Sequence, residues 1–274
     1  MTSFSPWVSF CISTYQRPEI LHKQLLLLSQ QILTDFEVVV SDNDPDKSAR
    51  KIVENLSDSR FKYFHNNENF GMIRSFNKSI ERSSADFIVM VTDDDPVDCD
   101  FLTVFHELYK KYPLYSIYCG FKRVGKADSA IEFIPKDEFL AEVLDPSKTS
   151  NLLWSSSIIR KADAIKIGLI PDYEGSHLAD HAFIAMVGGI NGGVVMNKMF
   201  SKLSSHDSNF SKSNFEHYTK ACEGFYKFMM SALMGDKKIK RYESIFIKHL
   251  NKWFIVSIFS LKKYYTEFHY TIIK

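Results

Sequence analysis

The sequence contains few cysteines, and no two of them form a C-x-x-C pair. Their spacing argues against a zinc ribbon, a redox dithiol or a disulfide-stapled domain, and it is typical of a reducing compartment. Only 11 glycines and 8 prolines occur among the 274 residues, too few for a collagen-like or low-complexity chain. The chain is 45% hydrophobic and 24% charged, which predicts a globular protein with a large core. The four cysteines, all expected in that core, are Cys11, Cys99, Cys119 and Cys222.

Long hydrophobic runs are also missing. The longest nearly apolar run, at 253–261, has 9 residues and includes two serines, whereas a helix that crosses a bilayer needs about 20. The first residues carry no basic cluster, and the apolar stretch at 7–12 is too short for a secretory signal. We therefore expect a cytoplasmic protein.

Charge of one sign is not in excess, because the formal net charge of the whole chain is +1. The charges are unevenly distributed, however, since residues 220–274 contain 11 Lys and Arg against 4 Asp and Glu. A basic segment behind an acidic body suits nucleic acid, an anionic membrane surface or a solvated helix face. The acidic body argues against nucleic acid as a partner.

Short apolar runs alternate with helix-patterned stretches over the first hundred residues. The pattern predicts strands at 7–12, 36–40, 61–65 and 87–91, separated by helices at 20–31, 48–56 and 71–82. This βαβαβαβ order is typical of a mainly parallel, doubly wound α/β sheet. Beyond residue 100 we expect helices at 100–112, 138–144, 160–167 and 179–187, strands near 116–121, 152–159 and 188–199, and two or three helices within 214–274.

Each predicted strand of the first hundred residues is followed by a polar loop. In sheets of this kind, ligands bind outside the carboxyl ends of the strands, so four successive polar loops predict one site. The loops are 13–18, 41–44, 66–69 and 92–95.

The strongest single motif is Asp93-Asp94-Asp95, at the end of an apolar strand. Three adjacent carboxylates repel one another, and a hard divalent cation with the oxygens of its ligand would neutralise them. Asp93 and Asp95 alternate along the chain and can point to the same side. The alternative is an Asx-rich turn before Pro96 that caps the next helix.

A second motif is the loop that enters the helix predicted at 71–82. Asn69 can cap this helix, and Gly71 permits close approach of the backbone. Arg74 and Asn77 are three residues apart, so they lie on one side of the helix, where they can hold a neighbouring loop or a phosphate. A capped amphipathic helix also explains the pattern without a ligand.

Together these segments resemble the nucleotide-sugar-binding half of the family 2 glycosyltransferases, which have the GT-A fold. The order and spacing of the motifs agree with the family. The matching stretches are V-S-F-C-I-S-T-Y-Q-R at 8–17, F-E-V-V-V-S-D at 36–42, N-x-G-x-x-x-S-x-N at 69–77 and A-D-F-I-V-M-V-T-D-D-D at 85–95.

The resemblance implies a domain organisation. A Rossmann-like GT-A catalytic domain would occupy 1–212, with a nucleotide-sugar-binding half at 1–100 and an acceptor half at 101–212. A helical extension, rich in basic and aromatic residues, would follow at 213–274.

The resemblance also implies roles for residues of the first half. Thr14, Tyr15 and Arg17 would lie near the nucleotide, and Asp42 would bind its base. Asp95 would bind Mg²⁺ or Mn²⁺ that bridges the diphosphate, Asp93 would contact the ribose or a metal-bound water, and Asp94 could exchange roles with either. The other residues expected to bind the nucleotide sugar are Asn69 and Arg74.

Downstream, Asp180 stands where the family places the catalytic base. A carboxylate opposite the leaving diphosphate can take the proton of the acceptor hydroxyl while a metal stabilises the departing charge. The alternative is a carboxylate that only favours the start of a helix. His206 resembles the family's late histidine that reaches the metal or the diphosphate, and His177 and His181 are secondary candidates for contacting the acceptor.

Some positions depart from the family pattern. The usual Pro and Asn of the first motif are Ser13 and Gln16, the second acid after the second strand is Asn43, and an Arg of the third motif is Phe76. These changes bear on base specificity more than on the fold. Trp154 is expected in the core, with stacking on an acceptor sugar as the alternative.

We therefore hypothesise a metal-dependent inverting glycosyltransferase. It would move one sugar from a nucleoside-diphosphate sugar, with UDP favoured by the family, to a glycan or lipid-linked glycan of bacterial O-antigen, lipopolysaccharide or capsule type. The Q-x-x-R-W motif of processive synthases is missing, since no Gln follows Gln31. The basic extension would either contact the cytoplasmic face of the inner membrane or pack as a helical hairpin.

Two other functions are consistent with parts of the pattern. A sugar-1-phosphate nucleotidyltransferase would need a Gly-rich loop after the first strand, and residues 13–17 contain no glycine. A non-catalytic module that binds nucleotide sugars or glycans would explain the departures, but not the presence of Asp93, Asp95, Asp180 and His206.

Overall fold

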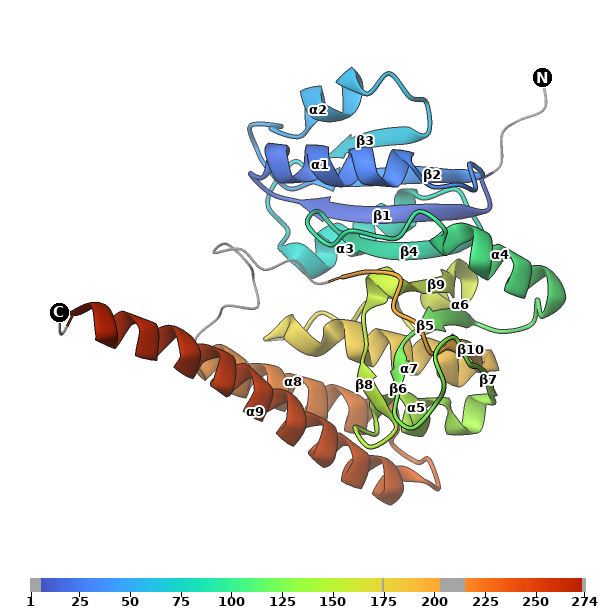
Figure 1. The fold of residues 1–274 in the computed structure, drawn as a ribbon, viewed down its shortest axis with the longest axis vertical. Coiled ribbons are helices and arrows are strands. Elements are labelled where there is room, and N and C mark those ends of the chain that lie inside the picture. The colour runs from blue at the N-terminus through green and yellow to red at the C-terminus, as the bar shows by residue number, and fades with distance from the viewer. Residues whose placement is uncertain (1–5, 174, 203–214, 273–274) are drawn as a thin grey trace.

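The computed structural model describes residues 6–173, 175–202 and 215–272. A sheet of 8 strands runs through the molecule in the order β3-β2-β1-β4-β9-β5-β10-β7 (Figure 1). The four strands predicted for the first hundred residues are confirmed, and they are mutually parallel, so their carboxyl ends meet at one edge. They are β1 (Val8–Thr14), β2 (Phe36–Asp42), β3 (Phe61–His65) and β4 (Phe87–Thr92).

The other half of the sheet is mixed. β9 (Ser157–Arg160) runs antiparallel to both of its neighbours, β4 and β5 (Ile117–Gly120), whereas β10 (Gly193–Met196) is parallel to β5. β9 begins later than predicted, because Trp154–Ser156 form a turn of 3₁₀ helix. The sequence did not predict the antiparallel edge strand β7 (Ile131–Ile134) or the separate pair β6 (Lys122–Arg123) and β8 (Thr149–Asn151).

Helices cover both faces of the sheet. Along β4, Phe87, Val89 and Val91 face one layer, while Ile88 and Met90 face the other, as the two-residue period of a strand requires. Both sets are fully or almost fully buried, which explains why the strand is a continuous apolar run. The first layer contains α1 (Pro18–Ser29), α2 (Arg50–Asn55) and α4 (Phe101–Lys111), and the second contains α3 (Met72–Arg82), α5 (Lys136–Leu144), α6 (Lys161–Lys166) and α7 (Ala179–Asn191).

The four cysteines are free, but they are not all in the core. Cys11 and Cys119 are buried as expected, and burial raises the pKa of the Cys11 thiol to about 12. The expectation is wrong for Cys99, which is exposed, and for Cys222, which is only partly buried. Cys99 follows the acidic loop in a segment outside the regular elements, where no apolar periodicity requires burial.

Two helices, α8 (Phe215–Ala232) and α9 (Ile239–Ile272), form a hairpin on the second layer, and α9 projects beyond the body (Figure 1). The described part of the extension packs on the body, as one of the two alternatives predicted. Glu138 of α5 also pairs with Arg241 at 2.8 Å and Lys238 at 3.1 Å, and these cations lower the pKa of Glu138 to about 2. The hairpin side chains in the same core cluster as α5 and α7 are Phe225, Met229, Tyr242, Ile245, Phe246 and Leu250.

The division of the chain at residue 212 stays a prediction, and the hydrophobic core of the described residues extends across it. Over the described ranges, none of the helices combines the length and the apolar character that a membrane crossing requires.

Candidate active site

The acidic loop after β4 is held by residues that follow β1. Because β1 and β4 are neighbouring parallel strands, with Ser13 opposite Thr92, the loops at their carboxyl ends touch. Thr14 Oγ1 donates a hydrogen bond to Asp93 Oδ2 at 3.0 Å, and Arg17 Nε donates to the same oxygen at 3.1 Å. Arg17 also contacts Asp93 Oδ1 through Nη2 and donates from Nη1 to Asp94 Oδ2 at 3.3 Å. The structure thus brings four of the predicted nucleotide residues together.

The Asp93 carboxylate is almost inaccessible to solvent, at 1% exposed. Burial raises its pKa to about 6, and the Arg17 guanidinium opposes this rise while the neighbouring Asp94 adds to it. Since Arg17 contacts both carboxylate oxygens, Asp93 is suited to fixing the first loop against the acidic loop.

The acidic loop alone is not a complete metal site. Among the described residues, no group of three or more His, Cys, Asp or Glu side chains is arranged to hold a metal ion. Asp95 is 6% exposed, and its backbone carbonyl accepts a hydrogen bond from Gln24 Nε2 of α1 at 2.8 Å. Mg²⁺ is commonly bound by one or two carboxylates together with the phosphates of a substrate, and a single Asp95 fits that mode.

His206, the predicted third metal residue, lies outside the described residues. The chain leading to it is anchored beside the acidic loop. Val97 and Ser201 form an antiparallel bridge, and the backbone N–H of Lys202 donates to the carbonyl of Pro96 at 3.2 Å.

Asp42, the predicted base-binding residue, ends β2 at the same edge and is fully buried. Its Oδ1 accepts the backbone N–H of Asp44 at 2.9 Å, and its Oδ2 accepts that of Ala49 at 3.2 Å and the hydroxyl of Tyr63 at 3.0 Å. Burial, followed by the Asp42 charge, raises the pKa of Tyr63, which keeps the hydroxyl a hydrogen-bond donor. The Asp42 carboxylate is therefore fixed in orientation.

The second and third loops are joined by amide side chains that the sequence did not single out as a network. Asn66, 1% exposed, donates from Nδ2 to Asn43 Oδ1 at 2.8 Å and to Ser41 Oγ at 3.0 Å. Asn43 in turn donates to the carbonyl of Gly71 at 3.0 Å. Asn43, a departure from the family pattern, thus connects two loops of the candidate site.

The polar residues of the third motif mainly form contacts that fix the neighbouring loops. Asn69 is exposed, and its Oδ1 accepts the backbone N–H of Gly71 at 2.9 Å, while Gly71 itself, at φ 81°, begins the helix. The expectation that Asn69 caps this helix is therefore wrong. Arg74 Nε pairs with Asp172 at 2.7 Å, and Asn77 exchanges two hydrogen bonds with the backbone of Ile170, at 2.9 and 3.0 Å. Arg74 and Asn77 thus hold a neighbouring loop, which is one of the interpretations that the sequence leaves open, and nucleotide-sugar binding by Asn69 and Arg74 stays a prediction.

Two aromatic residues near the site differ in exposure. Tyr15 is 43% exposed, although it follows the buried Thr14. Trp154 is 7% exposed and packs on Phe76 with ring centroids 4.7 Å apart, which confirms the core interpretation of this tryptophan. Phe76, another of the departures from the family pattern, is part of the same packing.

Asp180 lies in the first turn of α7, and its side chain is 21% exposed. Its Oδ1 accepts the backbone N–H of His181 at 2.9 Å, and its Oδ2 lies 3.8 Å from Nε2 of the His181 ring. Burial raises the pKa of Asp180 to about 7. A carboxylate with a pKa near neutrality is a stronger base than an exposed aspartate, which is the property that proton abstraction needs.

The model of the family described as Glycosyl transferase family 2 matches residues 9–168. This is more than half of the chain, which therefore belongs to glycosyl transferase family 2. The match includes the first three loops and the acidic loop, whereas Asp180 and the helical hairpin lie beyond it.

One relative is the GalNAc(5)-diNAcBac-PP-undecaprenol beta-1,3-glucosyltransferase of Campylobacter jejuni subsp. jejuni serotype O:2. It is 31% identical over 93 residues, which cover 33% of this chain. The similar region spans 30% of that relative, well under half of its length.

Two solved structures show the fold. S. aureus TarS 1-349 in complex with UDP-GlcNAc is similar with a TM-score of 0.68 and 16% identity, over 90% of this chain and 72% of that one. Mannosyltransferase PcManGT from Pyrobaculum calidifontis, in complex with GDP-Man and Mn²⁺, gives a TM-score of 0.63 and 16% identity, over 93% and 73% of the two chains. The chain has the GT-A fold with carboxyl-terminal helices, as the sequence predicts.

Proposed function

We propose that this chain transfers a single sugar from a nucleoside-diphosphate sugar to a glycan or lipid-linked glycan acceptor in the synthesis of a bacterial surface polysaccharide. The observation that carries the proposal is the convergence of Thr14, Arg17 and Asp42 with the acidic loop at one edge of the sheet. Family membership supports the class of reaction. The acceptor class follows the name of the Campylobacter relative, which acts on an undecaprenol-linked glycan.

The donor would lie across the carboxyl ends of β1, β2 and β4. Asp42 would bind the base, the role that the family resemblance gives it, although in the structure its carboxylate is fully buried and accepts three hydrogen bonds. Tyr15, which is 43% exposed, would contact the donor, and Arg17 would place positive charge near the diphosphate. UDP is the proposed nucleotide, although the two structural neighbours contain UDP-GlcNAc and GDP-Man respectively.

A divalent cation, Mn²⁺ or Mg²⁺, would be held by Asp95 and the donor diphosphate, with His206 and Asp93 as the further metal residues of the proposal. When bound, the cation would neutralise the charge that develops on the leaving diphosphate. The neighbour that contains Mn²⁺ supports the use of a divalent metal. Asp94, paired with Arg17, would complete the anionic loop.

Asp180 would be the catalytic base. It would take the proton of the acceptor hydroxyl while that oxygen forms a bond to the anomeric carbon and the bond to the diphosphate breaks. One displacement of this kind inverts the configuration at the anomeric carbon. The pKa of about 7 leaves a substantial ionised fraction at neutral pH, so that the base form is available.

Ligand-dependent thermal stability tests the proposal. We expect one nucleoside diphosphate, with UDP as the first candidate, to raise the melting temperature in the presence of Mn²⁺, because a ligand that binds only the folded state stabilises it. The measurement is a panel of nucleoside diphosphates and their sugars with and without Mn²⁺, followed by an assay of donor hydrolysis with the best ligand.

Two outcomes of this panel would contradict the proposal in different ways. The absence of any stabilisation across the panel would exclude the donor site. Stabilisation without hydrolysis or transfer would instead favour the non-catalytic module that binds nucleotide sugars.

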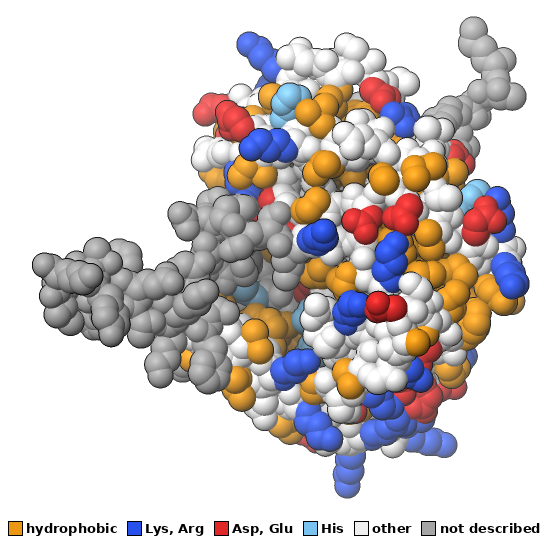
Figure 2. Space-filling view, in the orientation of Figure 1, with side chains coloured by type: hydrophobic (Ala, Val, Ile, Leu, Met, Phe, Trp, Pro, Cys, Tyr) orange, Lys and Arg blue, Asp and Glu red, His pale blue; other side chains and the backbone are white. Residues whose placement is uncertain are grey.

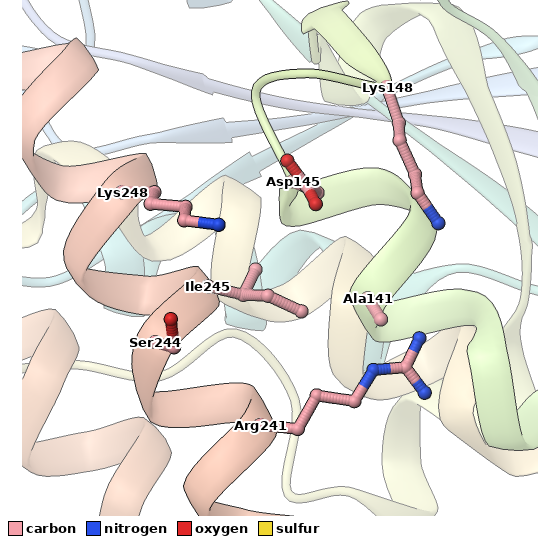
Figure 3. A pocket seen from close by; sticks show the side chains of 7 residues that line it. All are labelled: Ala141, Asp145, Lys148, Arg241, Ser244, Ile245 and Lys248. Atoms are coloured by element: carbon pink, nitrogen blue, oxygen red, sulfur yellow. The ribbon is translucent and has the colours of Figure 1, made fainter.

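The helical hairpin is proposed to contact an anionic membrane surface from the cytoplasmic side. Lys and Arg side chains gather over α5 and the start of α9 (Figure 2). A pocket of about 300 Å³ lies between the two helices, with Arg241 and Lys248 of α9 opposite Asp145 and Lys148 (Figure 3). Further along α9, Ile255 and Val256 are more than half exposed.

Binding to vesicles tests this contact. We expect salt-sensitive binding to phosphatidylglycerol-containing vesicles, weakened about 10- to 30-fold by Lys248→Gln with Lys252→Gln, because each lysine near the surface contributes about 1 kcal/mol. Lys110→Gln with Lys111→Gln on α4 removes the same charge elsewhere and serves as the control. The proposal would be contradicted if both double substitutions weakened vesicle binding equally, or if the wild type did not bind the vesicles. Deletion of 237–274 is unsuitable, since α9 supplies core residues.

A further inference from the structure

A histidine of the helical hairpin is hydrogen-bonded to the residue next to Asp180. His249 of α9 and His181 of α7 face each other with 2.9 Å between His249 Nε2 and His181 Nδ1. His249 is 7% exposed, and the side chain of His181 is 15% exposed. The other ring nitrogen of His181, Nε2, lies 3.8 Å from Asp180 Oδ2. A chain of contacts thus leads from α9 to the proposed base.

The surroundings keep both rings neutral. Burial lowers the pKa of His181 to about 4 and that of His249 to about 3, although hydrogen bonds to the backbone of Leu152 and Leu144, respectively, oppose the shifts. The other ionisable groups nearby are Lys252 of α9, Tyr173, whose pKa Asp180 helps to raise, and Cys222 of α8, which lies near Tyr173. At neutral pH the pair therefore carries two ring protons.

The two ring protons cannot serve all three hydrogen bonds of the pair, which are the bond between the rings, the bond of His249 to Leu144 and the bond of His181 to Leu152. The bond between the rings needs one proton, and the second can go either to the Leu144 side of His249 or to the Nε2 of His181. When His249 donates to His181, the remaining proton of His181 is on Nε2, the ring nitrogen that lies 3.8 Å from Asp180 Oδ2. An ionised Asp180 favours this arrangement, because an N–H near a carboxylate stabilises its charged form.

We propose that His249 is a positioning residue, which holds the His181 ring so that its Nε2–H faces Asp180 and keeps this carboxylate ionised. The inference deepens the proposed function and rests on it for the role of Asp180. It also makes the hairpin part of the catalytic apparatus, although the hairpin lies outside the segment that matches the family. Loss of the contact would free the ring, weaken the stabilisation of the carboxylate and raise the pKa of Asp180.

Titration of Asp180 by carboxyl ¹³C NMR tests the inference without donor or acceptor, with Asp180→Asn used to assign the signal. We expect His249→Phe to raise the Asp180 pKa by about half a unit or more, whereas His249→Gln, which can still donate to His181, restores most of the wild-type value. His181→Phe is expected to give a similar rise, and the double variant His181→Phe/His249→Phe no further one, because both residues act through one contact.

An Asp180 pKa that is the same in the wild type and in His249→Phe would overturn the inference, even if the variant were less stable. If His249→Phe fails to fold, the other two variants decide. The inference would then be overturned if His249→Gln and His181→Phe changed the Asp180 pKa by the same amount. Failure of the proposed function is a separate result, since it would appear as a wild type that binds no nucleotide sugar. Where transfer is measured, the pH dependence of kcat should shift with the Asp180 pKa while KM for the donor stays unchanged.

Discussion

Replacement of Asp180 by Asn is expected to lower the rate of sugar transfer by about 10²-fold or more, in the range for loss of a general base. The amide keeps the shape of the side chain and can still accept the backbone N–H of His181, so the first turn of α7 should be preserved. The proposed donor site lies at the ends of β1, β2 and β4 rather than on α7, so donor affinity should not change. Transfer kinetics, together with donor titration, measure both quantities.

The pH dependence of the free energy of unfolding provides a control for Asp180→Asn. The folded-state pKa of Asp180, about 7, is above its ordinary value, so the folded protein binds more protons than the unfolded chain between about pH 4 and pH 7. The ionised carboxylate therefore costs stability above pH 7, and the cost disappears as the pH falls. Asp180→Asn should accordingly be more stabilising, or less destabilising, at pH 8 than at pH 4. Unchanged transfer in a folded variant would remove Asp180 from the mechanism.

Replacement of Asp95 by Ala is expected to abolish the stabilisation that Mn²⁺ adds in the presence of a nucleoside diphosphate. For the wild type at about 100 times the dissociation constant, binding contributes about 2.7 kcal/mol, which corresponds to a rise of roughly 5–10 °C in a protein of this size. The variant should keep the part of the shift that the nucleotide gives without metal. Melting curves with nucleotide alone, Mn²⁺ alone and both together separate these contributions.

The control for the Asp95 variant is Asp128→Ala. Asp128 is an exposed carboxylate that pairs with Lys122 at 3.2 Å, away from the acidic loop. Its replacement removes the same charge and should leave the Mn²⁺ effect intact. Equal Mn²⁺-dependent shifts in wild type and Asp95→Ala would show that Asp95 does not hold the cation.

Much of the first half of the fold could be predicted because its signals are local. Strands buried on both faces are continuous apolar runs, and α3 separates its buried residues, such as Ile73, Phe76 and Ile80, from a polar face. The direction of β9 left no such signal, because local periodicity does not encode which way a chain crosses a sheet. The strands β6, β7 and β8 have two to four residues each, too few for a two-residue period to stand out.

The candidate site could be predicted as a place more readily than as a set of contacts. The polar loops identified the edge of the sheet, but the pairing of Arg17 with Asp93 joins residues that are 76 positions apart. The role of Asn66 is equally non-local, since its partners come from two other loops. His249 left a weak sign, because it stands in an apolar stripe of α9 with Tyr242, Ile245 and Phe246, where a buried polar ring requires a partner.

The core that joins α5 and α7 to the hairpin has a consequence for how the protein is made in the cell. Its contributors from α9 include Phe246 and Leu250, so the apolar surfaces of α5 and α7 stay uncovered until α9 has left the ribosome. A nascent chain halted before α9 would present these surfaces to chaperones and proteases. Truncation after Trp253 would keep the α9 residues of this core, whereas truncation before Tyr242 would remove them and is expected to yield no stable product.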